Sequence, residues 1–314
     1  MVFEFSSVIV NVILGMIIVF LGTIALTIFF RILGQNNLIG NLYSNVRGGI
    51  PRGIGLIPWI MISLFFPSDF NNLILVMGFF ALLDDIFGRY KLLFLPMEIG
   101  QLFRGIGMIV VILLGYPIMG FSAILVALMI QPMNISDMQP GSTTSVVIIM
   151  SIISLAVMIL IGSSTYNNSI PAIYPAIVLI LFSIAYSPLD YMGKIMMGEV
   201  GNHSFAIALG IVFYLIGGFL SNLIFFILTA ILISIIRRNT LNQFFKDHLG
   251  IKNPVFGDYL MDVLTGGGLG DLLRRVFLGK KQMNIKNPIL LNLGFRRLFY
   301  NPRSVKKSKK HSSS

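Results

Sequence analysis

Nine apolar runs follow one another between residues 8 and 236, and they leave few folds open to this chain. Only the first, residues 8–30, comfortably reaches the roughly 20 residues that a helix needs to cross the hydrocarbon core of a bilayer. The others are shorter, so we expect them to use polar flanks or to lie between other helices. They are residues 54–66, 70–83, 106–116, 118–130, 146–161, 170–185, 205–216 and 223–236.

Charged residues are too few to build a water-soluble surface. They make up 11% of the 314 residues, while hydrophobic residues make up 56%. Soluble domains usually contain about 25% charged residues. We therefore predict an all-α fold, a polytopic transmembrane helical bundle of about nine spans.

Turns between the runs set the number of spans. Residues 54–83 as one helix would extend about 45 Å, too long for a core of about 30 Å. Pro67 also breaks helices, so we predict a hairpin at residues 67–69. Similar turns are predicted at residues 116–120, marked by Tyr116-Pro117, at residues 162–169, and at residues 217–222, marked by Gly217-Gly218, and a tenth span is not evident.

The distribution of charge orients the predicted bundle. Nine spans place all 23 Lys and Arg on one face. The N-terminus and the turns on the opposite face contain no Lys or Arg, and their charged residues are Glu4 and Asp69. By the positive-inside rule the basic face is cytoplasmic. We predict a multi-pass protein of the cell membrane, with its N-terminus outside and its C-terminus in the cytoplasm.

Beyond the last run the chain becomes polar and basic. We predict a transmembrane catalytic domain at residues 1–238, a partly interfacial cytoplasmic region at 239–303, and a disordered basic tail at 304–314. Residues 289–299 are too short to span but can lie at the interface. The Gly-rich residues 266–270 can start a phosphate-binding helix, although a flexible loop is the favoured reading. The basic residues lack a soluble folded module, which argues against nucleic acid as partner despite the net charge of +11.

Carboxylates are gathered on the predicted cytoplasmic face. Asp84 and Asp85 close the third run, Asp137 follows the fifth and Glu199 precedes the eighth. Each alone is explained as well by a helix end in water, but carboxylates at membrane depth are costly and indicate function. Several at one depth, facing basic residues, suit a Mg²⁺ ion that carries phosphates.

Basic residues near these carboxylates are candidates for phosphate binding. Residues 47–55 form a Gly-rich loop that contains Arg47 and Arg52. Glycine lets backbone N–H groups approach phosphate oxygens, and arginine adds fork-shaped donors. Lys91 and Arg104 are further candidates. Many loops between helices contain Gly and Arg, so this pattern alone is a weak signal.

Four short motifs, in order along the chain, resemble those of the polyprenyl-phosphate N-acetylhexosamine-1-phosphate transferases, which include phospho-N-acetylmuramoyl-pentapeptide transferase. The family's Pro-Thr-x-Gly-Gly loop, Asp-Asp motif, Asn-x-x-Asp-Gly element and Met-Gly-Asp-x-Gly-Ser motif are matched in turn. The matching segments are residues 45–55 (NVRGGIPRGIG), 84–88 (DDIFG), 133–141 (MNISDMQPG) and 197–202 (MGEVGN).

The resemblance implies transfer of a sugar 1-phosphate from a UDP-activated amino sugar to a polyprenyl phosphate lipid. UMP would be released with Mg²⁺ as cofactor, in the synthesis of a cell-envelope or glycan precursor. Asp84 and Asp85 match the paired Asp that binds metal or takes a proton. Asn134 and Asp137 match the pair that contacts nucleotide or metal, and Glu199 stands where the family has a metal-binding Asp.

Departures from the family pattern keep other readings open. Glu199 is one methylene longer than Asp, Asp137 is not followed by Gly, and the His-rich motif of the bacterial peptidoglycan branch is missing. These features fit a divergent branch, for which an archaeal origin is one reading. A flippase of lipid-linked precursors and a catalytically weakened scaffold remain alternatives, and a homodimer is left open. We interpret the lone His203 as structural.

Overall fold

The computed structural model describes residues 2–44, 49–88, 90, 98–161, 173–279, 283 and 285–300. In this part of the chain nearly every element is a helix, which confirms the predicted all-α class. A short helical turn, η1 (Gly40–Leu42), precedes an antiparallel pair of two-residue strands, β1 (Tyr43–Ser44) and β2 (Ile50–Pro51). The chain divides after Phe226 into two compact units, and each is described by itself.

Six helices in the described residues are long and apolar enough to cross a membrane. Two shorter apolar segments accompany them, α2 (Leu56–Phe65) and the pair α5 (Ser122–Leu128) and α6 (Ile130–Ser136). Each of the nine apolar runs lies largely within these helices, and the number of spans stays a prediction. The six long helices are α1 (Val2–Gln35), α3 (Ser68–Phe87), α4 (Ile99–Met119), α7 (Ser142–Leu160), α8 (Tyr174–Tyr191) and α9 (Gly198–Ile236).

Three of the predicted turns agree with the structure, and the turn predicted at residues 162–169 lies outside the described residues. α2 ends before Pro67 and α3 begins directly after it. α9 is interrupted at Gly217-Gly218, where the backbone leaves helical geometry. Pro117 lies inside α4, and the reversal occurs at the end of the predicted turn, at Gly120 with a φ of 55°. Proline in a last helical turn does not have to end it, whereas this positive φ favours glycine.

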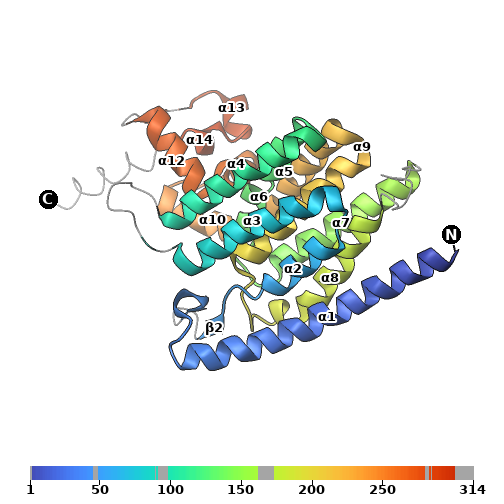
Figure 1. Cartoon of the computed structure of the whole chain (residues 1–314). Coiled ribbons are helices and arrows are strands. Elements are labelled where there is room, and N and C mark those ends of the chain that lie inside the picture. Colours follow the sequence, from blue (N-terminus) through green and yellow to red (C-terminus); the bar gives the residue numbers. More distant parts are fainter. Residues whose placement is uncertain are drawn as a thin grey trace. The chain divides into compact units, whose positions relative to one another are not determined.

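Close helix pairs make up the first unit. α3 packs along α4, and α7 packs along α8 (Figure 1). α1 lies against α8 and α2, while many of its apolar side chains, such as Leu14 and Leu21, are more than half exposed. Exposed apolar helix faces with internally paired backbones are what a lipid environment requires.

Short helices build the second unit after the end of α9. They are α10 (Arg238–Phe244), the π-helical turn η3 (Phe245–Leu249), α11 (Phe256–Thr265), α12 (Gly267–Leu278), α13 (Pro288–Asn292) and α14 (Phe295–Leu298). The Gly-rich stretch forms the start of α12, so the flexible-loop reading is wrong. The backbone can continue from Gly267, whose φ of 81° suits glycine, into a regular helix.

Ion pairs hold α14 against α11 in this unit. Arg297 is only 2% exposed and its Nε lies 2.5 Å from Asp262 Oδ1. Arg296 pairs with Asp258. These two arginines of the predicted interfacial segment therefore have internal partners. The predicted disordered tail, residues 304–314, lies outside the described residues.

Candidate functional site

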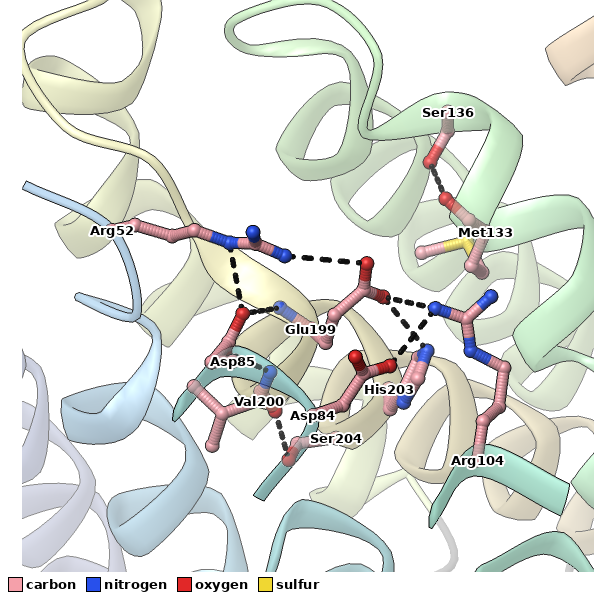
Figure 2. Close-up of polar contacts among 10 residues, drawn as sticks. All are labelled: Arg52, Asp84, Asp85, Arg104, Met133, Ser136, Glu199, Val200, His203 and Ser204. Atoms are coloured by element: carbon pink, nitrogen blue, oxygen red, sulfur yellow. Dashed lines mark hydrogen bonds and ion pairs between the residues drawn. The ribbon is translucent and has the colours of Figure 1, made fainter. Parts of the chain in front are cut away.

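Three carboxylates and two guanidinium groups meet in one polar cluster of the first unit (Figure 2). Asp84 and Asp85 come from the last turn of α3, and Glu199 comes from the first turn of α9. Arg52 follows β2, and Arg104 lies in α4. We call these five residues the carboxylate–arginine cluster. Its members come from four separate segments, so only the folded chain brings them together.

Asp85 anchors the start of α9. Its Oδ1 accepts from the Glu199 N–H at 2.9 Å and its Oδ2 from the Val200 N–H at 3.0 Å. Oδ1 also lies 3.0 Å from Arg52 Nε. The first N–H groups of a helix have no partner within the helix and favour negative charge. Asp85 satisfies two of them, which fixes the backbone of Glu199 beside the two arginines.

Glycine allows the anchoring carboxylate to come this close. Gly198 has a φ of 74°, and a Cβ atom there would lie 2.5 Å from Asp85 Oδ2 and 2.8 Å from the Gly53 Cα. Gly55 and Gly201 are packed as tightly, since a Cβ on Gly55 would lie 2.4 Å from the Gly201 Cα. Side chains at these positions would push α9 away from the loop that carries Arg52.

The backbone of residues 52–55, in the Gly-rich loop for which we predicted phosphate binding, has a different role. The N–H groups of Arg52, Ile54 and Gly55 donate to the carbonyls of Leu42, Met196 and Met197. These groups are not available to phosphate, so our expectation for them was wrong. The glycines here serve close packing onto α9. Arg47 and Lys91, two of the predicted phosphate partners, lie outside the described residues.

Glu199 lies at the centre of the cluster. Its Oε2 is 3.0 Å from Arg104 Nη2 and 3.1 Å from His203 Nε2, and its Oε1 is 3.6 Å from Arg52 Nη2. With its amide oriented to satisfy both groups, Asn134 donates to Glu199 Oε2 at 3.1 Å and accepts from Arg104 Nη1 at 2.8 Å. Asn134 of the third motif thus meets Glu199 of the fourth.

Asp84 and Glu199 face a polar cavity of about 250 Å³. Asp84 Oδ2 lies 3.2 Å from Arg104 Nη2. Its other oxygen fits against glycine, because a Cβ on Gly100 would lie 1.9 Å from Oδ1. Asp85 does not line the cavity. The cavity is lined by Arg52, Asp84, Gly88, Glu98, Gly100, Gln101, Arg104 and Glu199.

Burial and neighbouring charges shift the pKa values of groups in and beside the cluster. Burial opposes the charged form of Arg52, but the charges of Asp85 and Glu199 outweigh it and raise the pKa of the guanidinium. Asp137, at the end of α6, makes no ion pair among the described residues. Burial raises its pKa well above the ordinary value, and the charges of Glu199, Asp190 and Asp85 raise it further. Asp137 is therefore close to the cluster electrostatically but outside its ion pairs.

Two residues of this region were not predicted as part of it. Asp190 is 5% exposed and accepts from Thr144 Oγ1 at 2.8 Å, which ties the end of α8 to the start of α7. An acidic residue close behind an apolar run was the available signal. His203, which we interpreted as structural, contacts Glu199, and its spacing four residues after Glu199 on one helix indicated this.

The oxygen donors at the cavity suit a hard cation, although a complete site is not preformed. No three His, Asp or Glu side chains of the described residues are grouped as metal ligands. Mg²⁺ usually takes one or two carboxylates and completes its shell with water and substrate phosphates. Asp84 and Glu199 are the two carboxylates of the cluster that face the cavity, and they fit that pattern.

Comparisons with known proteins add nothing to the motif resemblance. No known protein-family model matches the chain, and no curated protein matches it.

Proposed function

We propose that this chain is a Mg²⁺-dependent membrane phosphoglycosyl transferase, similar to the polyprenyl-phosphate N-acetylhexosamine-1-phosphate transferases. It would move a sugar 1-phosphate from a UDP-activated amino sugar to a polyprenyl phosphate at the cytoplasmic membrane face and release UMP. One observation carries the proposal: residues from all four motifs meet around Glu199. Asp85 and Glu199, for example, are 114 positions apart in the sequence and in direct contact.

The cavity has the chemistry of a diphosphate site. Arg52 and Arg104 both line it, and guanidinium groups bind phosphate oxygens through paired N–H donors. The cluster has three carboxylates and two guanidinium groups, an excess of negative charge that suits a cation entering with the substrate. The bound ion would offset negative charge on the transferred phosphoryl group, and Asp84 and Glu199 would hold it.

The neighbouring side chains position these two carboxylates. Arg104 and Asn134 hold Glu199 by its Oε2, and Arg52 approaches its other oxygen. The extra methylene of Glu199 gives it the reach to meet both arginines from the first turn of α9. Asp85 acts through the backbone of α9, so we assign it a positioning role in place of the expected metal or proton contact.

Asp137 is the candidate proton acceptor. It makes no ion pair among the described residues, and burial together with the charges of Glu199 and Asp190 raises the pKa of its carboxyl, which makes it a better proton acceptor than an ordinary Asp. It would take the proton of a singly protonated lipid phosphate as the phosphate oxygen attacks the β-phosphoryl group.

The decisive experiment measures UMP release by the purified chain in lipid nanodiscs. With polyprenyl phosphate, Mg²⁺ and a panel of UDP-N-acetylhexosamines, we expect UMP and a lipid-linked sugar phosphate, detected by mass spectrometry. EDTA should stop the reaction and excess Mg²⁺ should restore it. Glu199→Gln should reduce turnover by roughly two orders of magnitude or more, because the change removes charge from a cation site.

Asp247→Asn is the matched control, since Asp247 is an exposed carboxylate in η3 of the second unit. It should leave UMP release unchanged. If no sugar nucleotide of the panel yields UMP, or if Glu199→Gln retains full turnover, the proposal is wrong. Movement of a lipid-linked precursor across the bilayer without UMP release would identify a transporter.

A further inference from the structure

The positive charge of the chain is concentrated in the second unit. Residues 227–314 contain 16 Lys and Arg against 4 Asp and Glu, whereas residues 1–226 contain 7 against 8. Residues 227–314 therefore have a net charge of +12 and residues 1–226 one of −1, which together give the +11 of the chain. Exposed basic side chains of the described residues there include Arg238, Lys246, Lys252 and Lys286.

α12 presents an apolar face that nothing in the described chain covers. Leu273, Val276 and Phe277 are 56%, 69% and 83% exposed. Their spacing of three and four residues places them on one side of the helix. An exposed phenylalanine flanked by two exposed aliphatic side chains is unusual on a surface in contact with water and marks an interaction site.

One buried side chain attaches the helix to the rest of the unit. Arg274 is only 6% exposed, and its Nη1 donates to the Thr265 carbonyl at 2.9 Å and lies 3.1 Å from Thr265 Oγ1. Thr265 ends α11, so Arg274 ties α12 to α11. Although Arg274 attaches the helix, Leu273, Val276 and Phe277 stay more than half exposed, so their side chains add little to the packing of the unit.

We propose that α12 lies in the plane of the membrane surface, with Leu273, Val276 and Phe277 inserted at the boundary of headgroups and acyl chains of an anionic leaflet. Helices with an apolar face in a basic setting bind in this way, and anionic lipids attract the basic residues around them. The second unit begins within α9, a candidate span, so it is covalently held at a bilayer surface. A second copy is a poorer partner, because two units with this excess of positive charge repel each other. The inference does not depend on the proposed catalytic activity.

Site-specific labelling tests the proposal directly, because the chain contains no Cys. An environment-sensitive fluorophore is attached to Val276→Cys in the full chain, reconstituted in nanodiscs of phosphatidylcholine with or without phosphatidylglycerol. We expect quenching by doxyl-labelled lipids to be roughly threefold stronger than for a label at Asn253→Cys, an exposed polar position of the same unit. The anionic lipid should increase it, and 1 M salt should reduce that increase.

A second substitution separates insertion from loss of structure. In the Val276→Cys background, Phe277→Asp should abolish the lipid quenching and Phe277→Leu should retain most of it, because only the former puts a charge into the interface. Equal accessibility of the Val276 and Asn253 labels to a water-soluble quencher in both lipid mixtures would overturn the proposal. Protection of the label that grows with protein density and does not depend on anionic lipid would also overturn it, in favour of a second copy.

Discussion

Replacing Asp85 by Asn tests whether this carboxylate holds the first turn of α9. Asn keeps one carbonyl oxygen, so it can accept only one of the two N–H groups of Glu199 and Val200 properly. With its oxygen in the place of Oδ1 it still accepts from Glu199 and Arg52, but its amide N–H₂ then faces the Val200 N–H, and Arg52 loses a charged partner. Breaking a buried ion pair costs about 3–5 kcal/mol, and a hydrogen bond to a charged group contributes about 1.5–3 kcal/mol.

We expect Asp85→Asn to lower the free energy of unfolding by about 2–3 kcal/mol. This is less than the loss of a fully buried ion pair, because Arg52 stays partly solvated. Its side chain is 15% exposed. Trp59 is the single Trp of the chain, and its Nε1 donates to the Ile74 carbonyl between α2 and α3. Its fluorescence during heating therefore reports unfolding of the first unit, with Asp247→Asn as the control.

UMP release measured on the same samples distinguishes positioning from chemistry. If Asp85 acts through α9, melting temperature and turnover fall together in Asp85→Asn. Unchanged melting with lost turnover would mean that Asp85 takes part in the reaction itself, and the assignment of a positioning role would be wrong. An unchanged melting temperature together with unchanged turnover would refute the claim that Asp85 anchors the start of α9.

Two further predictions follow from the packing and charge of this region. Gly55→Ala should lower the melting temperature, with a loss of about 1–3 kcal/mol, because the new methyl group would meet the Gly201 backbone; Gly105→Ala, where a Cβ meets nothing within 4 Å, is its control. Asp137→Asn should change the pH dependence of stability in Mg²⁺-free buffer. Because burial raises the pKa of Asp137, its contribution to stability is present below the ordinary value of 3.8 and is lost as the pH rises through the raised pKa. The parent should therefore lose stability relative to Asp137→Asn over that interval in thermal melts, and parallel curves would contradict the placement of Asp137.

Much of the fold could be predicted from the sequence because lipid imposes a simple rule on the backbone. An apolar run in a chain with few charges must be helical, and each of the nine runs lies largely in helices. Within the predicted turn, residues 116–120, Pro117 was the marker but does not make the reversal. A proline restricts its own helix locally, but the reversal requires a residue that tolerates a positive φ, and Gly120 supplies it three residues later.

The sequence was enough to predict which residues form the candidate site, but only some of their roles. Motif order was enough to nominate Asp84, Asp85, Asn134 and Glu199, and the structure brings them to one place. The use of the Gly-rich loop could not be predicted, because glycine permits both a close ligand and a close helix. Only the position of Met196 and Met197 beside residues 52–55 decides between them.

The adjacent residues Asp84 and Asp85 have different roles in the site. Consecutive positions on an α-helix point about 100° apart, so the two neighbouring carboxylates of α3 point in different directions. Asp84 faces the cavity and Arg104, whereas Asp85 faces the start of α9. The pairing therefore links a carboxylate at the cavity to the backbone that carries Glu199, through one turn of helix. A substitution of either residue disturbs the same site, but only one of the two is placed to touch what binds there.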